Sequence, residues 1–288
     1  MKRRFLFVCV VLLGVTAFLP AENIFNRYSI MSPLGLASGG FMSAVYNDSY
    51  NLYNCPSLIG IRDYSYHEVS YFRDTFGNIL FQLSTVSEKK ELAPYNAGLK
   101  IYYNDFSDET MTCRNYGINP ALSVRIMEKL LAGISFLIYK NSLAGTSNLL
   151  FLSSFSVNYS VMKDGLAGLY VKNIGSDLTY FGKYSDTFYP DLGLFYNHMF
   201  PFDLQAQAVF NYSSYNEFES SLSFLYHFIL PVMEIIPVLG FHYSREQEFL
   251  DSLSFGLSLQ FKPLQTEFGF KTVDSESIYS VSIKSISF

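Results

Sequence analysis

Side chains that commonly perform catalysis or bind metals are few and scattered in this sequence. The four histidines are His67, His198, His227 and His242, and no two of them have the spacing of a helical H-E-x-x-H zinc motif. There is also no phosphate-binding glycine loop, no G-x-S-x-G nucleophile motif and no C-x-x-C pair. The sequence therefore predicts that the protein is not an enzyme, with no catalytic residue, no metal site and no cofactor.

Three weaker arrangements of these side chains were also considered. His227 and His242 fall on the polar faces of neighbouring predicted strands and could lie close together, although solvated histidines are the favoured interpretation. A phospholipase would need a lipid-facing Ser–His pair, and nothing singles out one of the many serines. An oxidising compartment would allow a disulfide between Cys55 and Cys113, but their spacing does not enforce the short approach it needs. Free thiols are therefore expected.

The N-terminus has the pattern of a cleaved signal peptide over residues 1–21. Met1-Lys2-Arg3-Arg4 is positively charged, residues 5–19 are apolar, and Ala21 is a small residue suited to cleavage. An uncleaved membrane anchor is the alternative, but the apolar run is short for a spanning helix. The sequence therefore predicts an exported protein.

The composition is unusual for a soluble secreted protein. The chain has 28 Phe, 23 Tyr and no Trp, while charged residues make up only 16%. Removal of three basic residues with the signal peptide changes the formal net charge from −5 to −8. An acidic chain without a basic run offers no electrostatic surface for nucleic acid, so no nucleic-acid partner is expected.

Hydrophobic residues alternate with polar ones along most of the mature chain. In residues 251–261, one face carries Leu253, Phe255, Leu257, Leu259 and Phe261, and the other carries Ser252, Ser254, Gly256, Ser258 and Gln260. This period of two is typical of a strand with one apolar face and one polar face. About fourteen such segments are predicted, near 63–72, 77–86, 95–104, 116–126, 131–141, 149–161, 164–172, 189–199, 203–213, 217–228, 235–244, 251–262, 264–272 and 276–288. Short gaps make neighbouring strands antiparallel.

Strand length and face composition favour a membrane barrel. Many segments reach ten to twelve residues, which crosses a bilayer at a tilt, whereas strands of soluble sandwiches are shorter. The polar faces carry Ser, Gly, Asn and Gln where a water-facing sheet would carry Lys and Glu. The sequence thus predicts an all-β fold, a transmembrane antiparallel β-barrel; a secreted sandwich or lipid-binding β-protein is the alternative.

Two apolar runs could instead form helices, and the C-terminus offers separate support for the barrel. Residues 128–140 keep an alternating pattern, and in 224–243 the residues Pro231, Glu234 and Pro237 suit a turn between strands. The chain ends on Phe288, and an aromatic end on a last strand is typical of recognition by the outer-membrane assembly machinery. Because Ile286 and Phe288 have the opposite parity to Ile283, a bulge near 284–285 is expected.

The segment SPLGLASGGFMSAVYNDSYNLYNCPSLIG, residues 32–60, carries Asp48 as its only charge. It resembles the N-terminal signature of FadL-like outer-membrane proteins, especially the PorV/PorQ and UPF0164 branch. The matching positions are Gly35, Gly39, Gly40, Phe41, Ala44, Asn47-Asp48, Leu52, Tyr53 and Pro56. Cys55 and Ser57-Leu58 depart from the family's N-P-A-G turn. Independently, glycines allow tight packing, and Asp48 suits the cap of a short helix or turn.

This resemblance implies a hatch inside a fourteen-strand barrel, in the outer membrane of a double-membrane bacterium. The expected organisation is a signal peptide at 1–21, a hatch at 22–61 and a barrel at 62–288; a flexible tether is the alternative for the hatch. The implied function is passive uptake of long-chain fatty acids or other hydrophobic small molecules. A PorV-like docking component for protein export or surface attachment is the second hypothesis. Candidate ligand-contacting residues are Gly39, Gly40, Phe41, Met42, Asp48 and Pro56.

Overall fold

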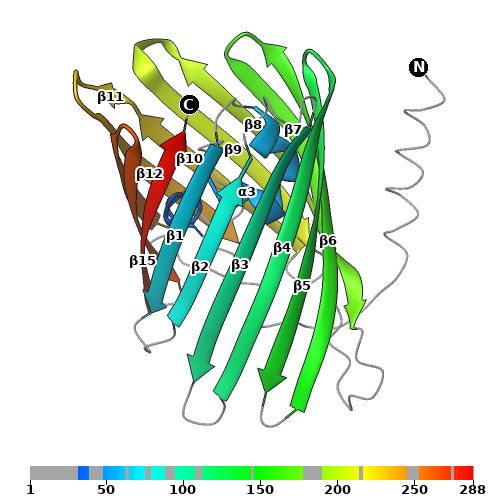
Figure 1. The fold of residues 1–288 in the computed structure, drawn as a ribbon. Coiled ribbons are helices and arrows are strands. Elements are labelled where there is room, and N and C mark those ends of the chain that lie inside the picture. The colour runs from blue at the N-terminus through cyan, green and yellow to red at the C-terminus, as the bar shows by residue number, and fades with distance from the viewer. Residues whose placement is uncertain are drawn as a thin grey trace, which may run out of the picture.

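The strands of the computed structural model form one closed antiparallel barrel (Figure 1). The structure describes residues 32–38, 48–61, 65–74, 79–87, 95–107, 112–143, 146–177, 190–213, 217–244, 253–273 and 276–287. The expected signal peptide, Gly39, Gly40, Phe41, Met42 and Phe288 lie outside the described residues.

The strands follow one another along the chain with short connections. They are β1 (Ser65–Asp74), β2 (Ile79–Val86), β3 (Tyr95–Ser107), β4 (Thr112–Met127), β5 (Leu130–Leu143), β6 (Thr146–Met162), β7 (Gly165–Asp177), β8 (Asp191–Phe200), β9 (Leu204–Ser213), β10 (Glu217–Tyr226), β11 (Phe228–Ile229), β12 (Glu234–Ser244), β13 (Leu253–Phe261), β14 (Leu264–Val273) and β15 (Glu276–Ser287). A 3-10 turn, η3 (Pro201–Asp203), joins β8 to β9.

Two pairings close the sheet on itself. β1 pairs with β15, and β10 pairs with β12, so that no edge remains open along the described part of the barrel. The two-residue β11 continues β10 beyond His227 and pairs with the start of β12. β10 and β11 therefore act as one interrupted strand, and the barrel has fourteen strands, as the sequence predicted.

Side chains alternate between an exposed apolar outer face and a buried inner face. In β2, Phe81 and Leu83 are exposed on the outside, whereas Gln82 and Ser84 are buried inside. Large apolar side chains in contact with water would be costly in a soluble protein, and here they form the lipid-facing surface. A soluble sandwich with an inward apolar face is thereby excluded.

The barrel is taller on one side than on the other. We call the end where β1 begins and β15 finishes the terminal end, and the opposite end the distal end. At the distal end, β6 begins at Thr146, four residues before Leu150, which pairs with the last residue of β7, Asp177. β7 in turn extends five residues beyond Lys172, which pairs with the first residue of β8, Asp191. Figure 1 shows this projection of β3–β6 at the lower edge of the view.

The outer face changes character where the tall side begins. Tyr103 and Tyr116 pack together with ring centroids 5.1 Å apart. Further towards the distal end, Arg114 lies 3.4 Å from Asp105 in an ion pair. An aromatic pair followed by charges is typical of the boundary between hydrocarbon and headgroups.

Three short elements pack inside the barrel, and their residues are almost fully buried (Figure 1). They are α2 (Pro33–Ala37), α3 (Asn51–Asn54) and η2 (Pro56–Gly60). Ser32 starts α2 because its Oγ accepts a hydrogen bond from Gly35 N at 2.8 Å and Pro33 fits the first helical position. No helix among the described residues is both long and apolar enough to cross a membrane. We refer to residues 32–38 and 48–61 together as the inner segments.

Two details of the sequence prediction are wrong. β15 pairs regularly with β1 and β14 through Lys284 and Ser285, without the expected bulge. Ile286 faces inward because it packs with Leu52 and Ile59 of the inner segments. In the run 224–243, the turn spans only the residues around Pro231, so Glu234 and Pro237 belong to β12.

Candidate functional site in the barrel lumen

α2 approaches the wall at β12, β13 and β14 through inward-facing glycines. A Cβ on Gly269 would overlap the carbonyl oxygen of Pro33, and a Cβ on Gly240 would overlap that of Ala37. The Ala37 carbonyl also accepts a hydrogen bond from Ser254 Oγ at 2.8 Å. Glycine is required at these wall positions because the helix backbone lies directly against the strand backbone.

η2 is held against β4, β5 and β6 in the same way. Gly133 leaves room for the backbone of Ser57, where a Cβ would overlap the Ser57 nitrogen. Ser57 N donates a hydrogen bond to Ser156 Oγ at 2.8 Å, and Ser123 Oγ donates to the Ser57 carbonyl at 3.2 Å. Pro56, a predicted site residue, starts this turn and is buried. Ser57 Oγ also lies 2.6 Å from Ser156 Oγ, so the backbone and the side chain of Ser57 are both fixed to the wall.

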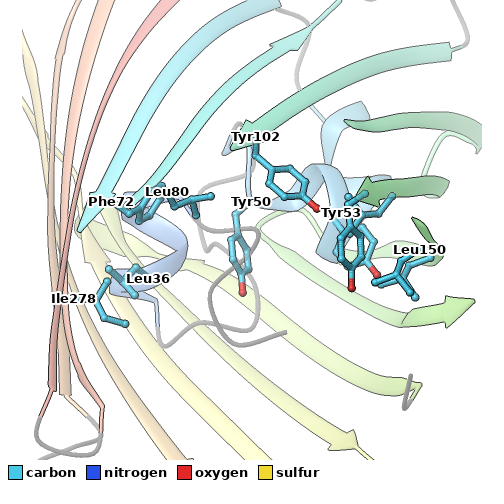
Figure 2. Close-up of a cluster of buried hydrophobic side chains, with 11 residues drawn as sticks. Leu36, Tyr50, Tyr53, Phe72, Leu80, Tyr102, Leu150 and Ile278 are labelled. Carbon is cyan, nitrogen blue, oxygen red and sulfur yellow. The ribbon is translucent and has the colours of Figure 1, made fainter. Parts of the chain in front are cut away.

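Between α2 and α3, the inner segments and the wall form an apolar cluster (Figure 2). The inner segments contribute Leu36, Tyr50 and Tyr53, and the wall contributes Phe72, Leu80, Tyr102, Leu137, Tyr139, Leu150, Leu152 and Ile278. We call this set the lumen cluster. Each member is at most 5% exposed. Three smaller apolar clusters also join the inner segments to the wall. The lumen cluster has the most members among the described residues and is therefore the first candidate for contact with a hydrophobic ligand.

Beside the lumen cluster, buried charges join three strands to the inner segments. Lys284 Nζ lies 2.9 Å from Glu267 Oε1 and 3.4 Å from Glu68 Oε2, and all three side chains are fully buried. Ser49 Oγ donates to Glu68 Oε1 at 2.9 Å. Asp48, the predicted capping residue, is also buried, and its Oδ1 accepts a hydrogen bond from Tyr50 N at 2.9 Å. We call Glu68, Glu267 and Lys284 the ionic triad.

The triad is bordered by polar atoms on β1–β3 that have no partner. Both polar atoms of Gln82, the hydroxyls of Ser70 and Ser84, and the Tyr102 hydroxyl make no hydrogen bond within the described residues. Lys100, fully buried on the same wall, is close enough to Glu68 and Asp48 for electrostatic attraction. Buried polar groups without partners cost about 1–3 kcal/mol each. This part of the wall therefore offers polar atoms that water or a polar group of a ligand could satisfy.

A second polar group anchors α3 to β7 and β8. Tyr53 OH donates to Asn173 Oδ1 at 2.8 Å, and Asn173 Nδ2 donates to Asp191 Oδ2 at 3.1 Å. Lys172 Nζ donates to Asn54 Oδ1 at 3.2 Å and lies 3.5 Å from Asp191 Oδ2. Asn173 has φ of 63° at a register shift in β7, which turns consecutive side chains inward. The irregular strand thus supplies partners for α3.

Two phenols and one thiol of the inner segments remain neutral in this environment. Burial raises the pKa of the Tyr50 and Tyr53 phenols far above their usual value. Burial likewise raises the pKa of the Cys55 thiol to about 12, with Ser57 and Ser156 opposing the shift through hydrogen bonds. Cys55 is a free, buried thiol and not a reactive one.

The histidines do not form a site. His227 lies at the terminal end, with Nδ1 2.7 Å from Glu234 Oε1, whereas His242 pairs with Ser221 much further along β10. The suggestion that they meet in the lumen is therefore wrong, because the register places them at different heights. His67 points outward and hydrogen-bonds Thr85 Oγ1 at 2.8 Å. Among the described residues, no cluster of three potential metal ligands occurs.

Sequence reasoning missed the inward charges and most of the lumen cluster. The three charged residues Lys100, Glu267 and Lys284 each lie on the polar face of an alternating strand. A single charge among the Ser and Asn residues of such a face could have indicated a buried ion pair. Phe72 and Leu80 occupy the same inward parity, but nothing local reveals that they face a buried segment and not water. Their role depends on contacts with residues far along the chain.

Solved structures share this architecture at low sequence identity. The toluene transporter TbuX of Ralstonia pickettii has a TM-score of 0.66 and 11% identity, covering 91% of this chain and 98% of that one. The CymD monoaromatic hydrocarbon channel has a TM-score of 0.65 and 11% identity, covering 91% and 97%. A FadL homologue of Pseudomonas aeruginosa has a TM-score of 0.61 and 9% identity, covering 88% and 97%.

The sequence comparisons add no closer assignment. No protein-family model matches the chain, and no curated protein matches it. The assignment to the PorV/UPF0164 branch therefore stays a prediction. The closed fourteen-strand barrel aligns over nearly the whole length of these channels, and the chain accordingly has a FadL-like fold.

Proposed function

We propose that this barrel conducts hydrophobic small molecules passively across an outer membrane. The observation that carries the proposal is the lumen cluster, a group of buried apolar side chains that extends from the inner segments to the wall (Figure 2). A path for ions or sugars would instead be lined by polar groups throughout. The fold, shared with hydrocarbon and FadL-type channels, supports transport in preference to catalysis.

The orientation follows from the lengths of the connections. The longest connection between strands, residues 178–190, is at the distal end. Each end has one eight-residue connection, 87–94 at the terminal end and 245–252 at the distal end, and each end has two-residue turns, but no connection at the terminal end is as long as 178–190. Outer-membrane barrels place longer loops outside the cell and short turns in the periplasm. Substrate would then enter at the distal end, meet the lumen cluster, and leave after the inner segments shift or through the wall.

Long-chain fatty acids are our first substrate hypothesis among hydrophobic molecules. Their chain suits the lumen cluster, and their carboxylate suits the adjoining wall, where Lys100 and the unpartnered Gln82 and Ser84 are buried. A hydrocarbon would make use of the apolar part alone. Mass spectrometry of lipid bound after mild purification would identify the substrate class.

The test is the substitution Leu80→Asn in the lumen cluster. Replacing a buried leucine by an amide removes apolar contact worth about 1.5–3 kcal/mol, so uptake of a fluorescent fatty acid into proteoliposomes should fall about tenfold or more. The matched control is Ser221→Asn, which adds the same amide to a buried inward position of β10 outside the cluster. Equal uptake by the two correctly folded variants would contradict the proposal.

A second candidate function, docking of another protein, is favoured by the turns at the terminal end. Phe202, Ile229 and Val232 are 87%, 70% and 78% exposed, and a hydrogen bond from His227 N to the Asp203 carbonyl joins the two turns that carry them. Phe202 has φ of 67°, a conformation that a bulky residue adopts only at a cost. Other turns at this end carry charges, as at Glu128-Lys129.

Site-specific photo-crosslinking in cells distinguishes this docking role from transport. A crosslinker placed at Phe202 should give one discrete adduct with an apolar-surfaced periplasmic protein, and a crosslinker at Lys129 should give none. If neither position yields an adduct, or if both yield the same heterogeneous mixture of adducts on the gel, the exposed turns are not a docking surface. Fatty-acid uptake by a Phe202→Ser variant should remain normal if docking and transport are separate.

A further inference from the structure

A groove runs across the outer face of the barrel where β13, β14 and β15 meet β1. Its volume is about 840 Å³, within the range of roughly 300–1,000 Å³ typical of small-molecule sites. Aromatic side chains form its sides, including Phe255, Phe268 and the Phe270–Tyr279 pair, whose ring centroids are 5.3 Å apart. Phe255, Phe268 and Tyr279 are exposed on the outer face, so the groove opens to lipid. We call it the wall groove.

The floor of the wall groove is backbone and not side chain. Gly256, Gly269 and Ser280 lie opposite one another on β13, β14 and β15, and their parity points inward. A Cβ on Gly256 would come within 2.5 Å of Ala37 Cβ in α2. The strand backbone at this point therefore has α2 on its inner side and the groove on its outer side. A molecule in the groove is separated from the inner segments by one layer of backbone.

Arg73 is a positively charged residue at the β1 edge of the groove, in the row of lining residues nearest the distal end. Arg73 is exposed on the outer face, directly opposite Tyr279 in the register. Across β2, its row continues through Ile79 to Asp105, the level at which the outer face becomes charged. Asp105 pairs with Arg114 on the far side, and within the described residues no ion pair includes Arg73. An available guanidinium at headgroup level favours an anion.

We propose that the wall groove is a binding site for an anionic membrane lipid. An acyl chain lies along the aromatic sides over the Gly256–Gly269 floor, and the headgroup phosphate contacts Arg73. The charge at the β1 edge of the groove and the apolar side chains that extend across β15, β14 and β13 match an amphiphile that lies across the strands. This inference does not depend on what passes through the lumen.

The absence of tryptophan from the sequence makes the site directly observable. Tyr279→Trp places one fluorophore at the groove, and Tyr116→Trp places a matched one beside Arg114, which is already ion-paired. Two vesicle preparations are compared, each with small and equal fractions of phosphatidylglycerol and phosphatidylcholine. In one preparation only the phosphatidylglycerol is brominated, and in the other only the phosphatidylcholine. In the Tyr279→Trp variant, brominated phosphatidylglycerol should quench about fivefold more effectively, the preference expected of one cation near the surface. The Tyr116→Trp variant should show little preference.

Adding Arg73→Gln to Tyr279→Trp should remove the preference, whereas adding Arg114→Gln should not. Each variant is first checked for heat-modifiable migration, so that loss of folding is not read as loss of binding. Equal quenching by the two lipids in the Tyr279→Trp variant, or the same preference in both tryptophan variants, would overturn the proposal. So would stronger quenching by a brominated free fatty acid than by phosphatidylglycerol, because the groove would then serve a transported molecule.

Discussion

At the scale of single residues, Lys284 joins two carboxylates that would otherwise repel each other. Its ammonium group contacts Glu68 on β1 and Glu267 on β14 while lying on β15 between them. Ser282 Oγ and Gln265 Nε2 donate further hydrogen bonds to Glu267, at 3.1 and 2.8 Å. A buried triad of this kind adds little net stability, but breaking it leaves an uncompensated charge.

Lys284→Met should therefore destabilise the barrel strongly. We expect a loss of about 3–5 kcal/mol, measured from urea unfolding in detergent micelles by the fraction of heat-modifiable protein. The matched control replaces all three members with uncharged residues, Glu68→Gln, Glu267→Gln and Lys284→Met, and should recover much of that loss. If the single and triple variants unfold alike, the triad is not an electrostatic unit.

Cys55 provides a test of burial with a defined pH dependence. Its thiol has a pKa of about 12 in the folded protein against an ordinary value of 9.0, so the folded state keeps a proton that the unfolded state loses. Cys55 therefore lowers stability as the pH rises from about 9 to 12 and has no such effect below this window. The same shift protects the thiol from alkylation.

With Cys113 replaced by Ser in the mature chain, iodoacetamide at pH 9 should modify Cys55 slowly. The thiolate fraction implied by the two pKa values differs by roughly 500-fold between folded and unfolded protein. Mass spectrometry of timed samples, with and without urea, measures the ratio. Comparable rates in both conditions would mean that η2 does not seal Cys55 against the wall.

At the scale of elements, the strands were predictable and the contacts of the inner segments were not. Alternation over residues such as Leu253 to Phe261 defines each strand and its outward face locally, so the observed bounds differ from the predicted ones by a few residues. The prediction of a bulge in β15 was wrong because apolar residues were assumed to face outward. Ile286 faces inward and packs against a segment more than 200 residues away. Contacts between distant segments have no local pattern.

The match between α2 and its glycines makes the seating of this helix testable. Gly269→Val would force the Pro33 carbonyl away from the wall, yet β14 would keep its ladder. We expect a folded barrel in which protease cuts near α2, with altered fatty-acid uptake or a new leak of small solutes. Ala206→Val, on the outer face of β9, is the control and should change neither.

The same reasoning applies to Gly39 and Gly40, which lie outside the described residues. If they are part of a hatch, replacement by Val should slow fatty-acid uptake or open a leak without preventing barrel assembly. Uptake and leakage that both stay normal would indicate a tether instead. Comparing these variants with Gly269→Val separates faults in the segment from faults in the wall that receives it.

At the scale of the whole molecule, closure of the sheet gives the protein its expected behaviour in detergent. The backbone hydrogen bonds of the strands run between neighbours around the ring, so unfolding requires the ring to open as a unit. The mature chain should show a β-dominated circular dichroism spectrum and should migrate differently on gels before and after heating. A helix-dominated spectrum would contradict the barrel.

Removal of Phe288 tests a different expectation at the same scale. A shortened chain should assemble poorly in the outer membrane of cells while still refolding in detergent, because Phe288 is expected to be a recognition signal and not a packing residue. Normal assembly in cells would refute the signal. Heat-modifiable migration of membrane fractions provides the measurement.

Strand number, order and orientation could be predicted because each follows from local alternation and short connections. Three features could not be predicted: the pairing of β10 with β12, the two-residue β11 and the lumen cluster. They depend on which strands pair to close the barrel and on which segment fills its interior. The likeness of residues 32–60 to a family signature indicated an inner segment. It gave no information on which wall residues such a segment would contact.

The unequal heights of the two sides of the barrel affect how the protein meets its surroundings. From the tip of β6 to the start of β8 the rim drops by about nine residues, or roughly 30 Å measured along a strand. With the distal end outside the cell, folded sheet of β3–β6 stands clear of the lipid, carrying Arg114 and Lys140 on its outer face. Antibodies and bacteriophages that approach the cell would then find the surface of these strands accessible above the lipid.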